Sequence, residues 1–272
     1  MSSLRFDLHA AGVLAPGLAS LADLRAACRD GRLPAATEPF QPPAPTVLPA
    51  NERRRASRVV RLALACIEQT LQASPFRVET LRSVFATDEG TGEVCQQMLE
   101  TLATTRQVSP LLFPNSVQNA PSGYFGIAWR NRQSATVVSL GLESFASGLL
   151  CAVTEAMATG QPVLLVAYDP AMTAPLDELL PVTEPVATAW IIGAGVRGPD
   201  VPPPLASFTL ELGQAGDAAP VPLPAWLPAH WAAISSARAL LALGLLEAAP
   251  GTVLHLTLGR QRMALCRTEA AA

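Results

Sequence analysis

Residues 134–169 constrain the fold of this chain more than any other stretch. Residues 136–140 are β-branched and apolar, a glycine-containing turn follows, and residues 143–159 form an apolar run of helical length. Gly160 then precedes a second apolar run at residues 163–167. Short β-branched runs favour strands, and a glycine directly after a helical run is typical of a helix end. The stretch therefore predicts a strand, a sharp turn, a helix and a second strand.

The turn before the expected helix is a place where several classes of α/β enzyme carry a nucleophile. A tight turn exposes one side chain, and the helix N-terminus offers free N–H groups and positive potential to an anion. The residue at the helix start is Glu143. A carboxylate suits the positive end of the helix dipole, but it is a poor acyl-carrying nucleophile compared with cysteine or serine.

This layout resembles the nucleophile segment of the β-ketoacyl synthases, the condensing enzymes of the thiolase fold. When Gly160 is matched to the glycine of that family, the family's cysteine falls on Glu143, and Ser144 and Phe145 replace the small residues that follow it. Residues 109–123, with their Phe-Pro, Ser, Asn and Gly, are similar to the loop upstream of the nucleophile strand. The resemblance covers residues 48–169. It is closest to the half-length chain length factors of aryl polyene pathways, which lack the cysteine and carry an acidic residue near that point.

The resemblance implies an α/β, thiolase-like half-fold: a layered mixed β-sheet with buried helices, plus a short C-terminal helix and hairpin. We expect a ketosynthase-like N-terminal domain over residues 1–212 and a reduced C-terminal extension over residues 213–272. In the thiolase fold the strand at 136–140 pairs with its counterpart across a dimer axis, so a partner subunit is implied. By the same resemblance, the acyl pocket and subunit interface are expected at Phe113, Asn115, Ser116, Asn119, Thr136, Val138, Leu140, Ser144 and Phe145.

The residues that full-length condensing enzymes use for decarboxylation are not evident. In those enzymes a second half-fold supplies two histidines and a lysine. The segment after Gly213 is too short for such a half, and His230 and His255 are read more simply as surface or interior residues than as catalytic bases. Lacking the nucleophile and these histidines, the chain is not expected to condense acyl chains alone.

An arginine run begins a helix that we expect over residues 51–72: Arg53, Arg54, Arg55 and Arg58. Cations at a helix N-terminus oppose the helix dipole, so groups outside the helix must compensate them. Two interpretations stay open. The run is either a solvated basic face with acidic neighbours or a docking patch for an acidic acyl carrier protein, which condensing enzymes must engage.

Composition excludes several other classes of protein. The 272 residues are 50% hydrophobic and 15% charged, which allows a large core in one soluble α/β domain or slightly more. A net charge of −3 gives no general attraction to nucleic acid or to an anionic membrane. Five scattered cysteines and three separated histidines favour reduced, buried thiols over disulfides or a metal site.

The chain start has no apolar signal region, and no apolar run reaches the length of a membrane span. We therefore expect a cytoplasmic protein. We expect no metal and no resident cofactor, with acyl-phosphopantetheine reaching the protein only through a carrier protein.

A helix expected at residues 91–104 has one apolar side, which should be buried: Val94, Met98, Leu99 and Leu102. Asp88 and Glu89 precede this helix. Adjacent residues point in different directions, so we interpret them as capping residues and not as an acid/base pair.

The second half of the chain carries weaker signals. Glycines at 193–198 have the spacing of a dinucleotide motif, but the proline-rich residues 199–204 forbid the helix that this motif needs. We expect a hairpin there, joining strands at 186–192 and 205–212. Proline-rich linkers are expected at 31–49 and 213–228, then a helix at about 228–248 and a closing hairpin of strands at 253–258 and 262–266.

Together these features favour a catalytically silent chain-length-factor-like subunit. It would pair with an active ketosynthase, with Glu143 as a structural anchor hydrogen-bonded to backbone N–H groups at its turn. Phe145 and the loop around Phe113 would shape the acyl tunnel. Two alternatives stay open: Glu143 promotes malonyl decarboxylation in a priming subunit, or the chain is a homodimeric protein that binds an acyl group or another small molecule.

Overall fold

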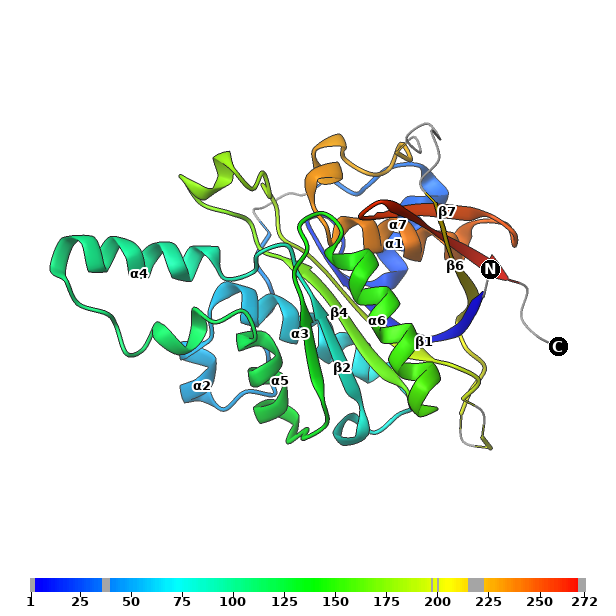
Figure 1. Ribbon diagram of the computed structural model, residues 1–272, viewed down its shortest axis with the longest axis horizontal. Helices are drawn as coiled ribbons and strands as arrows, with labels where there is room; N and C mark the ends of the chain where they lie inside the picture. The colour runs from blue at the N-terminus through cyan, green and yellow to red at the C-terminus, as the bar shows by residue number, and fades with distance from the viewer. Residues whose placement is uncertain (1–2, 36–39, 197, 200, 215–222, 269–272) are drawn as a thin grey trace.

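One mixed β-sheet runs through the whole chain. The structure is a computed structural model in which residues 3–35, 40–196, 198–199, 201–214 and 223–268 are described (Figure 1). Its strands are β1 (Leu4–Leu14), β2 (Arg82–Ala86), β3 (Ala135–Val138), β4 (Val163–Asp169), β5 (Val186–Gly193), β6 (Ala206–Gln214), β7 (Val253–Leu258) and β8 (Gln261–Thr268). They form an eight-stranded sheet in the order β3-β2-β4-β5-β1-β6-β8-β7. The pairs β2–β3 and β2–β4 are parallel and the other pairs antiparallel, which confirms the expected mixed sheet.

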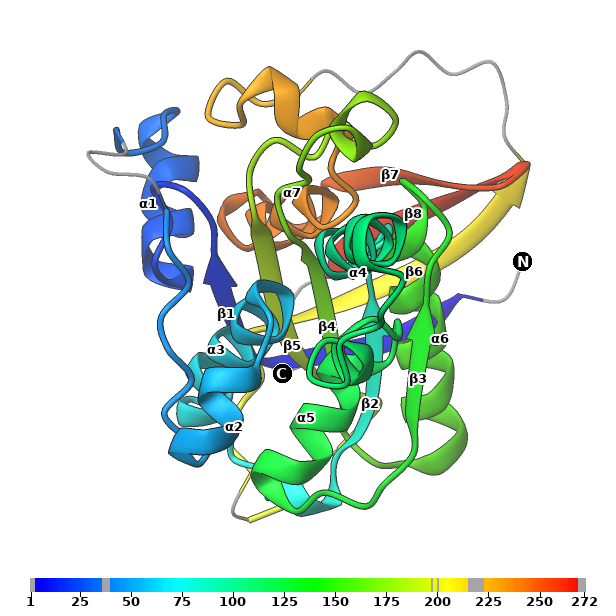
Figure 2. The same cartoon turned by 90° about the vertical axis from the view of Figure 1, so that its left-hand side faces the viewer.

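Helices cover both faces of this sheet, so the molecule has three layers (Figures 1 and 2). Successive side chains of β2 point to opposite faces of the sheet. Val84 and Ala86 join the core cluster on one face, and Phe85 joins the cluster on the other. One face is covered by α1 (Leu21–Asp30), α6 (Ser144–Thr159) and α7 (Ala237–Gly244). The other is covered by α3 (Arg58–Gln72) and α5 (Ala120–Trp129). Further elements are α2 (Ala50–Arg55), α4 (Gly92–Thr105), η1 (Val78–Thr80), η2 (Phe113–Asn115), η3 (Leu176–Glu178), η4 (Ala229–Ala233) and η5 (Leu245–Glu247).

The predicted strand, turn, helix and strand of residues 134–169 are confirmed as β3, α6 and β4. Small residues let α6 lie close to the sheet: a Cβ on Gly148 would stand 2.7 Å from that of Ala86. Gly160 ends the helix with a positive φ of 64°, a conformation that glycine adopts without strain. Burial of this helix fixes the position of the turn at its N-terminus.

The expected single helix over residues 51–72 is wrong. It is two helices, α2 and α3, separated at Ala56, whose extended backbone ends α2. Arg53, Arg54 and Arg55 consequently lie in the last turn of α2, where the helix dipole favours cations. The dipole conflict inferred from the sequence therefore does not arise for these three residues.

The expected hairpin of the strands at 186–192 and 205–212 is also wrong. β1 lies between β5 and β6 and pairs antiparallel with both of them. β1 is buried from Phe6 to Leu14, so its backbone N–H and C=O groups need hydrogen-bond partners on both edges. The helix expected at 228–248 is interrupted, as η4, α7 and η5.

The closing hairpin is confirmed as β7 and β8, and β8 pairs with β6 so that the C-terminal segment extends the same sheet. Of the described residues of the two proline-rich linkers, 31–35, 40–49 and 223–228 contain no helix or strand, whereas 213–214 belong to β6, so the second linker begins later than expected. The rest of those linkers, 36–39 and 215–222, and residues 197 and 200 of the glycine-rich segment lie outside the described residues. The domain division at residue 212 stays a prediction.

Candidate functional site: the turn before α6 and the surfaces beside it

The turn before α6 is closed on itself by Ser144. Gly141 has a φ of 59°, which allows the sharp reversal after β3. The buried Ser144 hydroxyl accepts a hydrogen bond from the Leu140 N–H at 2.8 Å and donates one to the Gly141 carbonyl at 2.7 Å. This hydroxyl therefore holds the turn and is committed to it. Leu140 itself is 58% exposed.

Glu143 is the N-cap residue of α6, but its side chain does not cap the helix. One of its carboxylate oxygens accepts a hydrogen bond of 2.6 Å from the Gly259 N–H, in the turn between β7 and β8. The expectation that this carboxylate binds N–H groups of its own turn is therefore wrong. Short Ser, Thr, Asp and Asn side chains are the ones suited to that bond, whereas the longer Glu side chain reaches the neighbouring hairpin.

A second residue of the C-terminal segment occupies the helix N-terminus. The Phe145 N–H donates to the Ser235 hydroxyl at 3.0 Å, and that hydroxyl donates in turn to the Leu142 carbonyl at 3.3 Å. The Phe145 ring is fully buried and packs against Trp190, with 5.4 Å between ring centroids. The N–H group that would face an anion at this helix end thus already has a partner within the chain.

Carboxylates gather where β2 and β4 end. Asp169 is fully buried and accepts from the Asp88 N–H and the Ser236 N–H, both at 2.7 Å, and from the Thr87 hydroxyl at 3.1 Å. Burial raises the pKa of Asp169. Burial, followed by the charges of Asp169 and Glu89, raises the pKa of Asp88.

The predicted capping by Asp88 and Glu89 is wrong, because no N–H of α4 donates to either carboxylate among the described residues. Thr91 is the N-cap of α4, and its N–H and hydroxyl bond to Glu89 at 2.9 and 3.3 Å. Asp88 belongs instead to the cluster around Asp169. No group of three or more side chains suited to a metal ion is found in the part of the chain that the structure describes.

The arm formed by α4 and residues 106–119 extends away from the sheet (Figures 1 and 2). Leu99 and Leu102 on α4 are 65% and 44% exposed, so the prediction that they are buried is wrong, although Val94 is buried. Leu111 and Phe113 on the returning loop are 64% and 58% exposed. The arm therefore presents an apolar surface to solvent in the single chain.

The other predicted residues of this loop have structural contacts. Asn115 is buried, and its amide donates to the Arg55 carbonyl at 3.1 Å. The Ser116 hydroxyl donates to the Phe113 carbonyl at 2.9 Å. Asn119 is exposed and precedes α5 without a side-chain cap bond. Asn115 thus joins the loop to the end of α2.

β3 is an edge strand of the sheet. Its Ala135 and Thr136 are exposed, whereas Val137 and Val138 are half-buried. The carbonyls of Ser134 and Val138 accept from Ser83 and Thr87 on the β2 side. Because backbone groups alternate in direction along a strand, those of Ala135 and Val137 face outward, where no strand pairs with them among the described residues.

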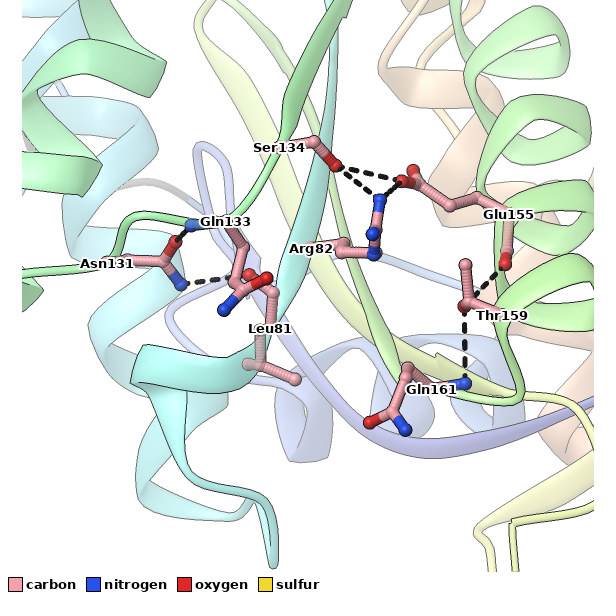
Figure 3. Close-up of polar contacts among 8 residues, drawn as sticks. All are labelled: Leu81, Arg82, Asn131, Gln133, Ser134, Glu155, Thr159 and Gln161. Atoms are coloured by element: carbon pink, nitrogen blue, oxygen red, sulfur yellow. Dashed lines mark hydrogen bonds and ion pairs between the residues drawn. The ribbon is translucent and has the colours of Figure 1, made fainter.

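A polar network fixes the beginning of this edge strand (Figure 3). Arg82 donates to the Ser134 hydroxyl at 2.8 Å and forms an ion pair with Glu155 on α6 at 3.0 Å, while Ser134 donates to Glu155 at 3.0 Å. Asn131 donates to the Leu81 carbonyl at 2.8 Å and accepts from the Gln133 N–H at 2.9 Å. The strand, the helix and β2 are therefore tied together at this end.

The arginines predicted to dock a carrier protein differ in their contacts: Arg53 is held by hydrogen bonds within the chain, whereas Arg54, Arg55 and Arg58 are exposed. Arg53 donates to the carbonyls of Thr46 and Leu48 at 3.3 and 2.9 Å, so it holds the preceding loop. Arg54 bonds to Asn51. Arg55 and Arg58 remain 57% and 73% exposed and pair loosely with Glu52 at 3.6 Å and Glu93 at 3.5 Å.

All five cysteines are free thiols, but only Cys66 is fully buried and Cys151 is exposed. The expectation of buried thiols therefore holds for Cys66 and not for Cys151. His230 is exposed and bonds to Glu184 at 2.9 Å. His255 lies half-buried on β7, and burial followed by the charge of Arg262 lowers its pKa.

The mixed sheet with a buried helix that starts at a tight turn after a parallel edge strand defines a thiolase-like α/β protein. Residues 29–206 match the family described as β-ketoacyl synthase, N-terminal domain. The match covers more than half of the chain, which therefore belongs to this family. A comparison with curated proteins gives no match.

Solved structures share this fold over nearly the whole chain. The ketosynthase ApeO in complex with its chain length factor ApeC from Xenorhabdus doucetiae matches with a TM-score of 0.71 and 23% identity, over 97% of this chain and 100% of that chain. The ishigamide ketosynthase/chain length factor matches with a TM-score of 0.72 and 14% identity, over 97% and 99%. A β-ketoacyl synthase from Burkholderia phymatum STM815 matches with a TM-score of 0.60 and 14% identity, over 79% and 65%. The resemblance to the thiolase-fold condensing enzymes is confirmed at the level of fold and family.

Within the described ranges, no helix is long and apolar enough to cross a membrane.

Sequence reasoning placed Glu143, Ser144 and Phe145 at the turn, and the structure brings them together there. It missed Ser235, Gly259 and Asp169, which complete the site from distant segments. No local pattern identifies these residues, because their role depends on how the C-terminal segment packs against α6.

Proposed function

We propose that this chain is a catalytically silent chain length factor of polyene or fatty-acid-type biosynthesis. It pairs with an active β-ketoacyl–acyl carrier protein synthase and shapes the pocket for the growing acyl chain. The observation that carries this proposal is the occupied turn before α6. Glu143 stands at the start of the helix with its carboxylate on Gly259, the Ser144 hydroxyl holds the turn, and Ser235 takes the Phe145 N–H. Acyl transfer needs an available nucleophile and free donors for the oxyanion, and these groups are committed elsewhere.

The pairing with a second subunit is supported by two surfaces. β3 offers outward-facing backbone groups at Ala135 and Val137, and an unpaired edge readily accepts another strand. The arm of α4 and residues 106–119 exposes Leu99, Leu111 and Phe113. Apolar groups gathered on one projecting element favour a covered interface over free solvent. The two chain length factor structures named above, ApeO with ApeC and the ishigamide ketosynthase/chain length factor, each include a ketosynthase.

Within this proposal the acyl pocket lies at the interface and not inside the single chain. Phe113, Asn119, Thr136 and Leu140 are exposed and available to a partner. Phe145 is buried against Trp190, so its ring packs in the core beneath the turn and is not available to a partner.

We also propose that an acidic acyl carrier protein docks beside α2. Arg54, Arg55 and Arg58 are exposed, and the ion pairs of Arg55 and Arg58 are longer than a hydrogen bond. Such loosely held cations are free to exchange a weak internal partner for an acidic surface. Arg53 is excluded from this patch because it holds the carbonyls of its own loop.

The test is elongation of carrier-bound acyl chains by the chain co-expressed with the ketosynthase encoded nearest to it. We expect activity from the pair, none when the partner's cysteine is replaced, and unchanged activity in Glu143→Ala. Loss of carbon dioxide release from malonyl carrier protein in Glu143→Ala would instead establish the decarboxylase alternative. A stable homodimer that ignores the ketosynthase would establish the binding-protein alternative.

A further inference from the structure

The C-terminal segment forms most of the wall of an open cavity that plays no part in the site described above. The cavity has a volume of about 840 Å³ and lies between α7, η5, the residues that precede η4 and the β7–β8 hairpin. In Figure 1 these elements lie together, with α7 beneath the β7 strand. Small-molecule sites typically enclose roughly 300–1,000 Å³. The size of this cavity is therefore that of a ligand site.

One wall of the cavity is apolar and aromatic. Trp226 and Trp231 line it, together with Leu241, Leu245, Leu254 and Leu256 from α7, η5 and β7. Trp231 is anchored because its indole N–H donates to Glu184. A fixed aromatic wall of this kind buries a hydrocarbon or aryl group at low cost in side-chain entropy.

Cations line the same cavity. Arg238 on α7 and Arg262 on β8 both contribute to it. The Nε atom of Arg238 is buried and has no hydrogen-bond partner among the described residues. Burial lowers the pKa of Arg238, an effect that the charge of Glu143 opposes. A buried guanidinium N–H without an acceptor is costly, and a carboxylate is the group whose geometry it matches.

Two carboxylates, Glu247 and Glu143, lie near these cations. Glu247 also lines the cavity, but its two oxygens bind Arg25 and Arg29 of α1, so its charge is already balanced. The charge of Glu143 acts on Arg238, but one Glu143 oxygen accepts from the Gly259 N–H and no ion pair within 4.0 Å joins Glu143 to Arg238 among the described residues. Burial, followed by the charge of Arg262, lowers the pKa of His255 and so favours its uncharged form, which adds no further positive charge.

We propose that this cavity binds an amphipathic carboxylate, a medium-length acyl acid, with its carboxylate at Arg238 and Arg262 and its chain along Trp226 and Leu245. The C-terminal segment then carries a ligand site of its own, separate from the subunit interface. The site needs neither Glu143 chemistry nor a partner, so it stands whether or not the chain is a chain length factor.

The test uses decanoate that carries a photoreactive diazirine on its chain. The protein, alone or in its co-purified complex, is irradiated with the probe, digested and mapped by mass spectrometry. We expect adducts on peptides that contain residues 226–256. Unlabelled decanoate should compete with this labelling, and decanol should not, because decanol lacks the carboxylate.

A paired variant tests the cations. Arg238→Gln with Arg262→Gln should reduce labelling about tenfold, the loss expected when charged hydrogen bonds are removed. Arg260→Gln, a change at an exposed arginine of the β7–β8 turn that does not line the cavity, should label as the parent does. Circular dichroism shows whether the variants are folded.

Absence of adducts in residues 226–256, labelling confined to the α4 arm or a partner, or equal competition by decanol would each overturn the proposal. If the paired variant fails to fold, the comparison of decanoate with decanol on the parent protein alone shows whether the cavity recognises a carboxylate. Failure of this test leaves ketosynthase pairing untouched, because pairing is measured without the probe.

Discussion

At the scale of single residues, Glu143 is the position on which the proposed lack of catalysis depends most. Its place at the start of α6 was predictable from the spacing between the β3 strand, the helix and Gly160. Its partner was not, because Gly259 lies 116 residues further along the chain. A short-range pattern identifies which residue occupies a turn, but tertiary packing decides what that residue binds.

Glu143→Ala should lower the free energy of unfolding by roughly 1 kcal/mol, because the Gly259 N–H loses its acceptor. Glu143→Gln keeps an acceptor oxygen and should lose less. Chemical denaturation of the three proteins measures these differences. Equal stability of all three would show that the bond to Gly259 contributes nothing to the fold.

The carboxylates beside the turn predict a dependence of stability on pH. The pKa of Asp88 is raised by burial and by the charges of Asp169 and Glu89, so the folded state retains this proton to higher pH than the unfolded state. Below the ordinary pKa, about 4, Asp88 is protonated in both states and has no effect. As pH rises from there through the raised folded pKa, stability falls, and above it the loss is complete.

Asp88→Asn should therefore raise the melting temperature at pH 8 and leave it unchanged at pH 3.5. Thermal unfolding monitored by circular dichroism at both pH values measures the effect. Asp177→Asn, at an exposed carboxylate of η3, is the matched control. If Asp88→Asn raised the melting temperature at pH 3.5 and left it unchanged at pH 8, the pH dependence would have the opposite sign. That result would contradict a raised pKa of Asp88.

At the scale of elements, the β3 edge and the α4 arm are the features with most consequence for assembly. Strand β3 was predicted from its β-branched residues, and its helix and following strand were predicted with it. The apolar stripe of α4 was also recognised, but Leu99 and Leu102 were assigned to the chain's own core. Periodicity shows that a face is apolar and does not show whether the same chain or another chain covers it.

Backbone pairing at β3 is tested by Ala135→Pro. Proline removes the outward-facing N–H and leaves the bonds of Ser134 and Val138 to β2 in place. We expect weaker pairing with the ketosynthase by at least about tenfold in dissociation constant, since even one backbone hydrogen bond contributes about 1 kcal/mol and an edge ladder contains several. Ala135→Thr retains the N–H in a good strand former and should pair normally.

Biolayer interferometry with immobilised ketosynthase measures the dissociation constants of the Ala135→Pro and Ala135→Thr variants. Loss of affinity in Ala135→Thr as large as that in Ala135→Pro would indicate that the side chain matters and that strand pairing does not.

The α4 arm is tested by Leu99→Ser with Leu102→Ser. These side chains are 65% and 44% exposed in the single chain, so the variant should be as stable as the parent and more soluble alone, yet should pair less with the ketosynthase. Leu179→Ser, at a leucine that is 80% exposed on the loop after η3, is the matched control. Unimpaired pairing of the double variant would remove the arm from the interface.

At the scale of the whole molecule, the family and the layered sheet could be predicted from the sequence, but the order of strands could not. The expected hairpin of β5 and β6 is divided by β1, the first strand of the chain, which is buried on both edges. Sequential neighbours were assumed to pair because most do. The C-terminal segment likewise looked like an appendage, yet it extends the sheet through β8 and supplies Ser235 and Gly259 to the turn before α6.

The central claim is that this molecule is one subunit of a heterodimer whose partner carries the chemistry. The most direct measurement is the mass, by size-exclusion chromatography with light scattering, of the chain co-expressed with its neighbouring ketosynthase. We expect a one-to-one complex that forms with the parent chain and dissociates more readily with Ala135→Pro. A chain that elutes alone or as a homodimer beside a free ketosynthase would contradict it.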